Sequence, residues 1–185
     1  MRIPTCGACQ NRPRMQMAFT IAITLGLLPV TAHTQTASTS SKSAQQEVVL
    51  RYFHDVLDGA RTEALDNLVL PDCDIHRPEG EVKGIASLRN MVAARRTNFS
   101  TFATDVRDIF ESGDRVVVRV QHQGIGKGLY RFRTGLQDIT GRTVTWEAIV
   151  IFRMRDGKIA EEWVSRDELG MLLSAGILKA SETGR

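Results

Sequence analysis

The chain has 185 residues, of which 42% are hydrophobic and 24% charged, a composition and length typical of one soluble globular domain. Its net charge of +3 arises near the N-terminus, where Arg2, Arg12 and Arg14 have no acidic neighbour. When these three of the 24 basic residues are set aside, 21 basic side chains stand against 21 acidic ones. This balance, without a clustered basic stripe, argues against nucleic acid as a partner.

Residues 1–32 have the pattern of a secretory signal peptide. Basic residues precede the apolar run MAFTIAITLGLLPV, which is too short to span a bilayer comfortably, and small residues lead up to Ala32. We therefore expect cleavage near Ala32 and an exported protein, either periplasmic or secreted. The alternative is an uncleaved membrane anchor.

The mature chain is expected to begin with a disordered polar spacer over 33–44, which is rich in Ser and Thr. A domain over 45–178 follows, and 179–185 form a flexible tail. The CxxC motif that begins at Cys6 lies in the segment to be removed and has no second pair, so we interpret it as incidental. Cys73 is then the only thiol of the mature chain, which excludes an internal disulfide.

The first part of the domain has helical periodicity. From about Gln45, apolar residues recur at helical spacing, and Gly59 stands where a helix cap belongs. A short second helix is expected over 61–70, followed by an extended or looped segment over 71–80. A third helix is expected over 84–98. Its core-facing positions are Ile85, Leu88, Met91 and Val92.

The second part of the domain has the two-residue alternation of strands. Four strands are expected, at 101–112, 115–126, 142–155 and 158–164, and an Asp-Gly turn joins the last two. A short helix over 166–176 follows them. Helices followed by sequential antiparallel strands indicate an α+β fold with the helices packed on one face of the sheet.

Alternation also assigns side chains to the two faces of the sheet. One strand has an inward set that ends in a histidine: Val116, Val118, Val120 and His122. The next strand has an uncharged inward set: Trp146, Ala148, Val150 and Phe152. Its opposite face carries Ile149 and Ile151, which predicts a homodimer through the outer face of the sheet. On the last strand, parity alone does not decide which set of residues points inward.

Several segments together resemble one known family, the SnoaL-like polyketide cyclases of the nuclear transport factor 2-like superfamily. The resemblance rests on VVLRYFHDVLDG, LPDCDIHRPEG, GDRVVVRVQHQG and above all GRTVTWEAIVIFRMRDGKIAEEWVSRDELGML, and it covers about Gln45 to Gly176. It implies a cone-shaped, curved antiparallel sheet packed on three N-terminal helices, with a short C-terminal helix. It also implies a deep and mostly apolar pocket for a small molecule.

The sequence departs from this family at its acid/base positions. The family aspartate after the DGKI turn corresponds to Val164, and a histidine or acid six residues before the turn aspartate corresponds to Val150. A loop carboxylate of the related steroid isomerases corresponds to Arg77, whereas their first-helix tyrosine corresponds to Tyr52. Valine can neither donate nor accept a proton, so the family mechanism does not transfer directly.

The resemblance places Val164 in the pocket, and Glu162 then points inward with it because alternate strand residues share a face. Glu162 is the first candidate for moving a proton, since burial raises a carboxyl pKa toward useful values. The alternative is a carboxylate that is solvated or ion-paired with Arg77 or Arg166.

Two further side chains are catalytic candidates. His122 could act as a general base, because its ordinary pKa of about 6.5 suits that role, or it could be a hydrogen-bonded histidine at the pocket rim. Tyr52 could donate to a carbonyl or enolate oxygen, or it could be a core aromatic whose hydroxyl binds a neighbour.

Other residues are expected to contact the ligand. Arg77 could bind a carboxylate or enolate, or form a structural ion pair. His76 points away from Arg77 if the segment is extended, so the two are not expected to enter the pocket together. The expected pocket wall consists of Trp146, Val150, Phe152 and Val164.

No metal or cofactor is expected. The histidines after residue 32 form no HxH or HxxxH pair and have no nearby Cys cluster. The glycine-rich GIGKG at 124–128 lacks P-loop spacing, and we interpret residues 124–133 as a hairpin or lid at the pocket mouth.

Two functions are open from the sequence. One is an exported pocket protein that acts on a small apolar carbonyl-bearing molecule as a cofactor-free isomerase, cyclase or hydrolase. The other is a non-catalytic ligand-binding or dimerisation module that has lost the family acid/base residues. Polar groups that converge in a closed cavity would favour the enzyme.

Overall fold

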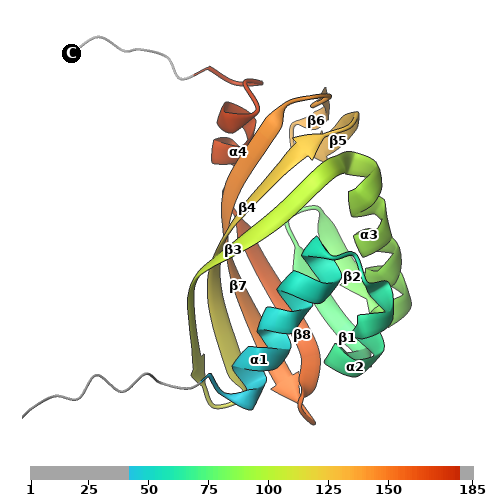
Figure 1. The fold of residues 1–185 in the computed structure, drawn as a ribbon, viewed down its shortest axis with the longest axis vertical. Helices are drawn as coiled ribbons and strands as arrows, with labels where there is room; N and C mark the ends of the chain where they lie inside the picture. Colours follow the sequence, from blue (N-terminus) through green and yellow to red (C-terminus); the bar gives the residue numbers. More distant parts are fainter. Residues whose placement is uncertain (1–41, 180–185) are drawn as a thin grey trace, which may run out of the picture. The chain divides into compact units, whose positions relative to one another are not determined.

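The computed structural model describes residues 42–179 (Figure 1). The predicted signal peptide over 1–32 lies outside the described residues, as do most of the predicted spacer and residues 180–185 of the predicted tail. In the described part of the chain, no helix is long and apolar enough to cross a membrane.

The first helix begins at a capping box. The Ser43 hydroxyl accepts from the Gln46 N–H, and the Gln46 side chain accepts from the Ser43 N–H, so helix α1 (Ala44–Arg51) starts at the end of the segment expected as spacer. The chain continues as a π-helix, η1 (Tyr52–Asp58), which ends at Gly59. Five of the six residues of the predicted apolar stripe are buried, namely Val49, Tyr52, Phe53, Val56 and Leu57, and the sixth, Val48, is half-buried.

The second predicted helix is shorter than expected, because a strand begins before the proline. Short turns η2 (Thr62–Ala64) and α2 (Leu65–Leu68) lead into β1 (Val69–Arg77), which pairs with β2 (Gly80–Lys83). Pro71 lies where the register of β1 shifts, and such an irregularity accommodates a residue without an N–H. The segment over 71–80, which was expected to be extended or looped, is therefore mostly strand.

The third helix, the four predicted strands and the last helix agree with the sequence pattern. Helix α3 (Gly84–Asn98) has the predicted bounds and buries Leu88 and Val92. The strands and the last helix then follow in this order: β3 (Phe99–Ser112), β4 (Arg115–Gly126), β5 (Leu129–Phe132), β6 (Gly135–Asp138), β7 (Thr143–Arg155), β8 (Lys158–Arg166) and α4 (Glu168–Ser174). Of these, β5 and β6 were not predicted as strands.

The fold is the predicted α+β arrangement of a curved sheet with helices on one side (Figure 1). Within residues 42–179, six strands form a sheet in the order β2-β1-β8-β7-β4-β3, and β5 and β6 form a separate hairpin. One feature of the prediction needs correction. The sheet was expected to be antiparallel, but β1 pairs with β8 in parallel, because α1 to α3 and the β1–β2 hairpin precede the long strands in the chain.

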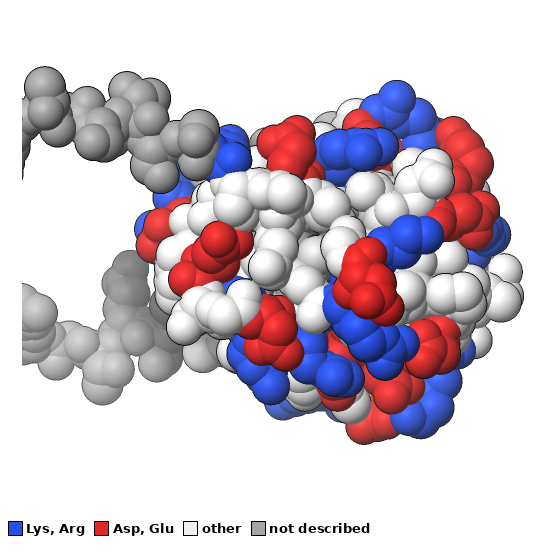
Figure 2. All heavy atoms as spheres, turned by 90° about the horizontal axis from the view of Figure 1, so that it is seen from below, with Lys and Arg blue, Asp and Glu red and all other residues white. Residues whose placement is uncertain are grey.

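The surface in Figure 2 carries basic and acidic side chains interspersed with one another, so this face presents no large field of a single sign. The outer face of the sheet is more apolar. Phe110, Val117, Ile151 and Trp163 form one continuous row across β3, β4, β7 and β8. Neighbouring Ile149 is 51% exposed.

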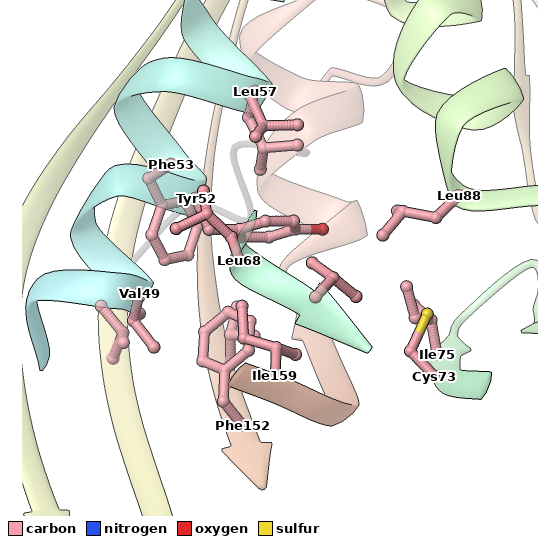
Figure 3. Close-up of a cluster of buried hydrophobic side chains, with 14 of the residues drawn as sticks. Val49, Tyr52, Phe53, Leu57, Leu68, Cys73, Ile75, Leu88, Phe152 and Ile159 are labelled. Carbon is pink, nitrogen blue, oxygen red and sulfur yellow. The ribbon is translucent and has the colours of Figure 1, made fainter. Parts of the chain in front are cut away.

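Two hydrophobic clusters fill the inside of the domain. The larger lies between the helices and the sheet, and Figure 3 shows Tyr52, Phe53 and Phe152 packed among aliphatic side chains from several elements. Tyr52 and Phe53 each meet Phe152 edge to face, at ring-centroid distances of 5.7 and 5.8 Å. The smaller cluster joins Phe99, Trp146 and the buried side of α4 with the β5–β6 hairpin.

Candidate functional site

A cavity of about 330 Å³ lies where the two clusters meet. Phe99 and Trp146 of the smaller cluster and Ala148 of the larger one contribute to its wall. The β5–β6 hairpin, predicted to cover the pocket mouth, contributes Tyr130 and Arg131. This volume suits a small ligand, since pockets for such molecules commonly measure a few hundred cubic ångström.

One wall of the cavity is aromatic. The ring centroids of His122 and Trp146 are 5.2 Å apart, and Phe102 lies 5.4 Å from His122 and 5.7 Å from Trp146. Register explains this grouping, because His122 on β4 is directly opposite Trp146 on β7 and Thr104 on β3. An apolar ring of a ligand could stack against this wall.

His122 ends a chain of hydrogen bonds that begins at Asp58. The Asp58 carboxylate accepts from the Thr104 N–H at 3.0 Å and from the Thr104 hydroxyl at 2.7 Å. Because that hydroxyl proton points to Asp58, Thr104 Oγ1 accepts from His122 Nδ1, 2.9 Å away. The tautomer that fits leaves Nε2 as an acceptor, and the structure gives Nε2 no partner among residues 42–179.

Burial and neighbouring positive charge keep this histidine neutral. Burial, followed by the charges of Arg95, Arg77 and Arg166, lowers the pKa of His122 from its ordinary value of 6.5 to about 3. Burial also raises the pKa of Asp58, although the hydrogen bonds from Thr104 oppose that shift. The imidazole is therefore neutral at neutral pH. Its lowered pKa corrects the expectation of an ordinary value of about 6.5, and it makes the free protein's His122 a weaker base than an exposed histidine.

Glu162 belongs to a second buried network. Its side chain is almost fully buried, its Oε2 accepts from the Tyr52 hydroxyl at 2.9 Å, and its Oε1 accepts from Arg77 Nη2 at 2.9 Å. Burial and the charge of Glu162 raise the pKa of Tyr52 well above its ordinary value. Both carboxylate oxygens thus have protein partners, and neither Glu162 nor Tyr52 lines the cavity.

Four arginines line the cavity. Arg131 on β5 is exposed, and the three others are partly buried: Arg77 at the end of β1, Arg95 in α3 and Arg166 at the end of β8. Arg77 pairs with Glu162, while Arg166 pairs with Glu79 and lies 3.6 Å from Glu168. Arg95 lies over the ring of Phe102, with its guanidinium carbon 4.2 Å from the ring centroid.

The structure divides the residues proposed from sequence into two groups. His122, Trp146, Val164 and Arg77 line the cavity, as does the rest of the aromatic wall. Glu162, Tyr52, Val150 and Phe152 lie deeper, in or beside the larger cluster, because this end of the sheet is filled by the first helix. Ala160 and Glu162 are buried and Val164 faces the cavity, so the inward set on β8 is the one that the resemblance implied.

His76 is on the opposite face from Arg77, as expected for neighbours in a strand. Its ring stacks on Trp163 at 5.4 Å, and its nitrogens contact Glu81 at 3.0 Å and Glu161 at 2.8 Å. Those two hydrogen bonds raise the pKa of His76. It is a residue of the outer face, away from the cavity.

Arg95, the Asp58–Thr104 link and the arginine cluster were not predicted as parts of the site. A signal for the arginines was present, because each continues the buried periodicity of its own element. Arg77 follows Cys73 and Ile75 at two-residue spacing, and Arg166 follows Glu162 and Val164 in the same way. Arg95 stands seven residues after buried Leu88 on α3.

Among the described residues there is no cluster of three or more His, Cys, Asp or Glu side chains that could hold a metal ion. The donors that do line the cavity are mostly guanidinium groups, which repel cations. The cavity is therefore suited to an organic molecule.

Comparison with known proteins agrees with this architecture. The sequence profile of the SnoaL-like polyketide cyclase family matches residues 47–174. No curated protein sequence matches the chain. Among solved structures, TsrD from Streptomyces laurentii is 22% identical, with a TM-score of 0.64 and coverage of 75% of this chain and 98% of that one. AclR from Streptomyces galilaeus is 21% identical, with a TM-score of 0.64 and coverage of 77% and 91%.

A SnoaL-like polyketide cyclase from Agrobacterium tumefaciens is 18% identical, with a TM-score of 0.59 and coverage of 70% of this chain and 95% of that one. At such low identities these structures support the shared fold and not a shared substrate. The profile match extends over more than half of the chain, from α1 to α4. The chain belongs to the SnoaL-like polyketide cyclase family.

Proposed function

We propose that this protein is a cofactor-free enzyme that moves a proton on a small carbonyl-bearing molecule, as an isomerase or cyclase does, with His122 as the acid/base group. The observation that carries the proposal is the Asp58–Thr104–His122 chain, which ends at an imidazole in the aromatic wall of the cavity. Family membership supports the same class of reaction.

The proposed reaction uses polar atoms of the cavity wall that have no hydrogen-bond partner in the described part of the chain. His122 Nε2 would take a proton from the carbon next to the ligand carbonyl, and the electron pair of that C–H bond would move onto the carbonyl oxygen as an enolate. Guanidinium N–H groups in the wall, on Arg77 and Arg166, are suited to stabilise that oxygen. Return of the proton to a different atom, or attack of the enolate carbon on a second carbonyl, would complete isomerisation or cyclisation.

Thr104 and Asp58 would act through the histidine. Thr104 fixes the tautomer by accepting from Nδ1, and Asp58 fixes the direction of the Thr104 hydroxyl. They are positioning residues, because Asp58 and Thr104 do not line this cavity.

Proton exchange tests this proposal without knowledge of the natural substrate. The purified protein would be incubated with aromatic ketones such as β-tetralone and benzylacetone in deuterated buffer, and loss of the protons next to the carbonyl would be followed by NMR. We expect catalysed exchange that falls about 100-fold or more in His122→Gln, the usual range for loss of a general base. The matched control is His76→Gln, since His76 lies on the outer face.

Exchange at the same rate in His122→Gln and wild type would contradict the proposal. A Glu162→Gln variant that keeps its exchange rate while folded would exclude Glu162 from the mechanism. Its side chain lies outside the cavity wall and has both oxygens occupied, so this is the outcome that we expect.

The alternative function is a binding module without catalysis. It is favoured by Val150 and Val164 at the two family acid/base positions, and by a Glu162 that is fully engaged with Tyr52 and Arg77. Ligand binding that is unaccompanied by proton exchange with any ketone of a broad panel would support this alternative.

We also propose that the protein forms a homodimer through the outer face of the sheet. The apolar row of Phe110, Val117, Ile151 and Trp163, with exposed Ile149 beside it, supports this assignment. Light scattering after gel filtration should give twice the monomer mass, and Ile149→Lys should give a monomer. Leu129→Lys, an equally exposed position on β5, is the control. A monomeric wild type would contradict the dimer.

Export is proposed from the sequence of residues 1–32 alone. N-terminal sequencing of the protein recovered from the periplasm or medium of a bacterial host should begin near His33. Full-length protein that sediments with membranes would instead support the uncleaved anchor.

A further inference from the structure

The cavity wall carries more positive than negative side chains, since Arg77, Arg95, Arg131 and Arg166 stand against Glu79 and Glu81. Arg95 makes no ion pair with any carboxylate in residues 42–179, although its side chain lies in the wall of the cavity. Its Nη1 atom is buried and has no hydrogen-bond partner there. Burial, followed by the charge of Arg77, lowers the pKa of Arg95, which shows that the site disfavours a further unpaired cation.

The two other partly buried arginines have unused donors as well. The Arg166 side chain is only 8% exposed, and its Nε atom has no hydrogen-bond partner in the described part of the chain, while its Nη2 atom lies 3.6 Å from Glu168 Oε2, beyond hydrogen-bond distance. Arg77 gives one N–H group to Glu162 while its Nε has no partner. A buried donor without an acceptor destabilises a protein, so unused donors from three separate elements around one cavity call for an acceptor.

We propose that the ligand of this cavity is a small aromatic or otherwise apolar molecule that carries one carboxylate, bound by Arg95 together with Arg166 and Arg77. The proposal names the substrate class of the proposed enzyme and in that sense rests on it. It also revises the expectation of a purely apolar ligand, because the wall combines an aromatic surface with cationic donors.

A carboxylate fits these donors better than the other common acceptors. A planar guanidinium offers two parallel N–H groups, which match the two oxygens of a carboxylate. Water or an amide could fill the hydrogen bonds, but neither would neutralise Arg95. A single negative charge is favoured, since Arg77 and Arg166 already face Glu162 and Glu79.

The proposal has a consequence for the base. His122 is affected by the positive groups Arg95, Arg77 and Arg166 and, through Thr104, by Asp58. A bound carboxylate would offset the repulsion from those arginines and strengthen the imidazole as a base. The carboxylate of the substrate would then make His122 a stronger base. Neutral ketones would therefore react more slowly than keto acids of the same shape.

Calorimetric binding with two matched ligands tests the proposal on the wild-type protein. The probes are β-benzoylpropionate, which carries an aromatic ring, a ketone and a carboxylate, and the primary amide of the same acid. We expect the acid to bind with an affinity about tenfold or more higher than that of the amide. The reason is that charge-assisted hydrogen bonds are roughly twice as strong as neutral ones. Equal affinities, or tighter binding of the amide, would overturn the proposal.

Substitutions at Arg95 and Arg96 test whether Arg95 causes the preference for the acid over the amide. Arg95→Met should abolish the preference for the acid, while Arg96→Met should keep it, because Arg96 is exposed and contacts the Gly59 carbonyl. If Arg95→Met does not fold, Arg95→Lys replaces it; retention of the charge with loss of the planar donor pair should reduce the preference without abolishing it. Undiminished preference in either folded variant would overturn the role of Arg95.

A second measurement separates this proposal from the proposed function. Histidine NMR should show the pKa of His122 rising by about one unit or more with saturating β-benzoylpropionate and not with the amide. Binding and NMR need no turnover. Acid preference without proton exchange would therefore refute only the enzyme, whereas exchange without acid preference would refute only the carboxylate.

Discussion

Two buried polar networks lie on the inner face of the sheet, and they differ in where their hydrogen bonds end. The first joins Tyr52, Glu162 and Arg77 and satisfies both oxygens of the carboxylate inside the protein. The second runs from Asp58 through Thr104 to His122 and ends in the wall of the cavity. Burial of an ionisable group is common to both, so burial alone does not mark a reactive group. A buried polar group in a cavity wall that lacks a protein hydrogen-bond partner does mark a candidate reactive group.

The difference follows from position along the strands. Glu162 lies opposite Phe152, in the larger hydrophobic cluster that the first helix covers. His122 lies opposite Trp146, which belongs to the smaller hydrophobic cluster, and both side chains line the cavity. Glu162 of the first network is therefore expected to stabilise the fold, and His122 of the second network is expected to take part in the reaction.

The largest effect is expected when the closed network loses its charge. Glu162→Ala leaves the buried Arg77 guanidinium without its partner, and breaking such a pair costs about 3–5 kcal/mol. Urea denaturation should therefore show a free energy of unfolding that is lower by about that amount. The control is Glu161→Ala, whose partners Arg153 and His76 are more exposed and which should cost about 1 kcal/mol. Equal losses in the two variants would remove the distinction between the networks.

The open network should make the protein sensitive to acid. The pKa of His122 is about 3 in the folded protein against an ordinary value of 6.5, so the unfolded chain binds the proton first as the pH falls. The resulting stability is complete above about pH 6.5 and is lost toward pH 3, by about 2–3 kcal/mol at pH 4.5.

His122→Gln should remove this part of the pH dependence. The pKa of Glu161 and of Asp72 is lowered, so both groups also lose stability in acid, but they do so equally in wild type and variant. The difference between the two unfolding free energies, measured by denaturation from neutral to acidic pH, isolates the histidine. A difference that is constant with pH would contradict a neutral buried His122.

A smaller effect is expected from the hydroxyl of Tyr52. Tyr52→Phe leaves Glu162 Oε2 without a donor, which should lower the free energy of unfolding by about 1–2 kcal/mol. Tyr130→Phe is a matched control, because the Tyr130 hydroxyl accepts from Arg166 only at 3.4 Å, and it should cost about 0.5 kcal/mol or less. If the two variants lose the same stability, the Tyr52–Glu162 bond does not stabilise the closed network.

The smallest effect concerns a reporter beside the closed network. Burial, followed by the charge of Glu162, raises the pKa of the Cys73 thiol from its ordinary value of 9.0 to about 11. The thiolate is the reactive form, so alkylation by iodoacetamide should be about 100-fold slower in the native protein than in urea. Mass spectrometry of the Cys73 peptide measures this rate. Glu162→Gln should raise it only severalfold, and a native rate equal to that in urea would contradict the burial of this thiol.

The sequence predicted the fold more fully than the site. The bounds of α3 and β4 and the inward faces of the long strands could be predicted, because they depend on periodic burial within one segment. The β1–β2 hairpin was missed because Pro71 and Pro78 argue against a strand, and only the pairing of β1 with β8 outweighs that local preference.

For the site, the sequence proposed the right residue types but could not say which of them meet. Glu162 and Tyr52 were expected in the pocket, yet they bind each other in the core beside it. Arg95 was not proposed as a site residue. It differs from Arg96 next to it only in helical phase, and the position of α3 on the sheet decides that this phase opens into a cavity.

The amino-acid sequence by itself determined the order of the longer helices and strands, the face that each buries and the family to which the chain belongs. These properties are local, since every residue contributes through its own propensity and its spacing from its neighbours. Only the tertiary structure decided that Arg77, Arg95 and Arg166 share one cavity and that His122 completes its bonds toward Asp58 and not toward Glu162. The reason is that convergence depends on the register of strands far apart in the chain, and burial patterns within one segment do not contain that register.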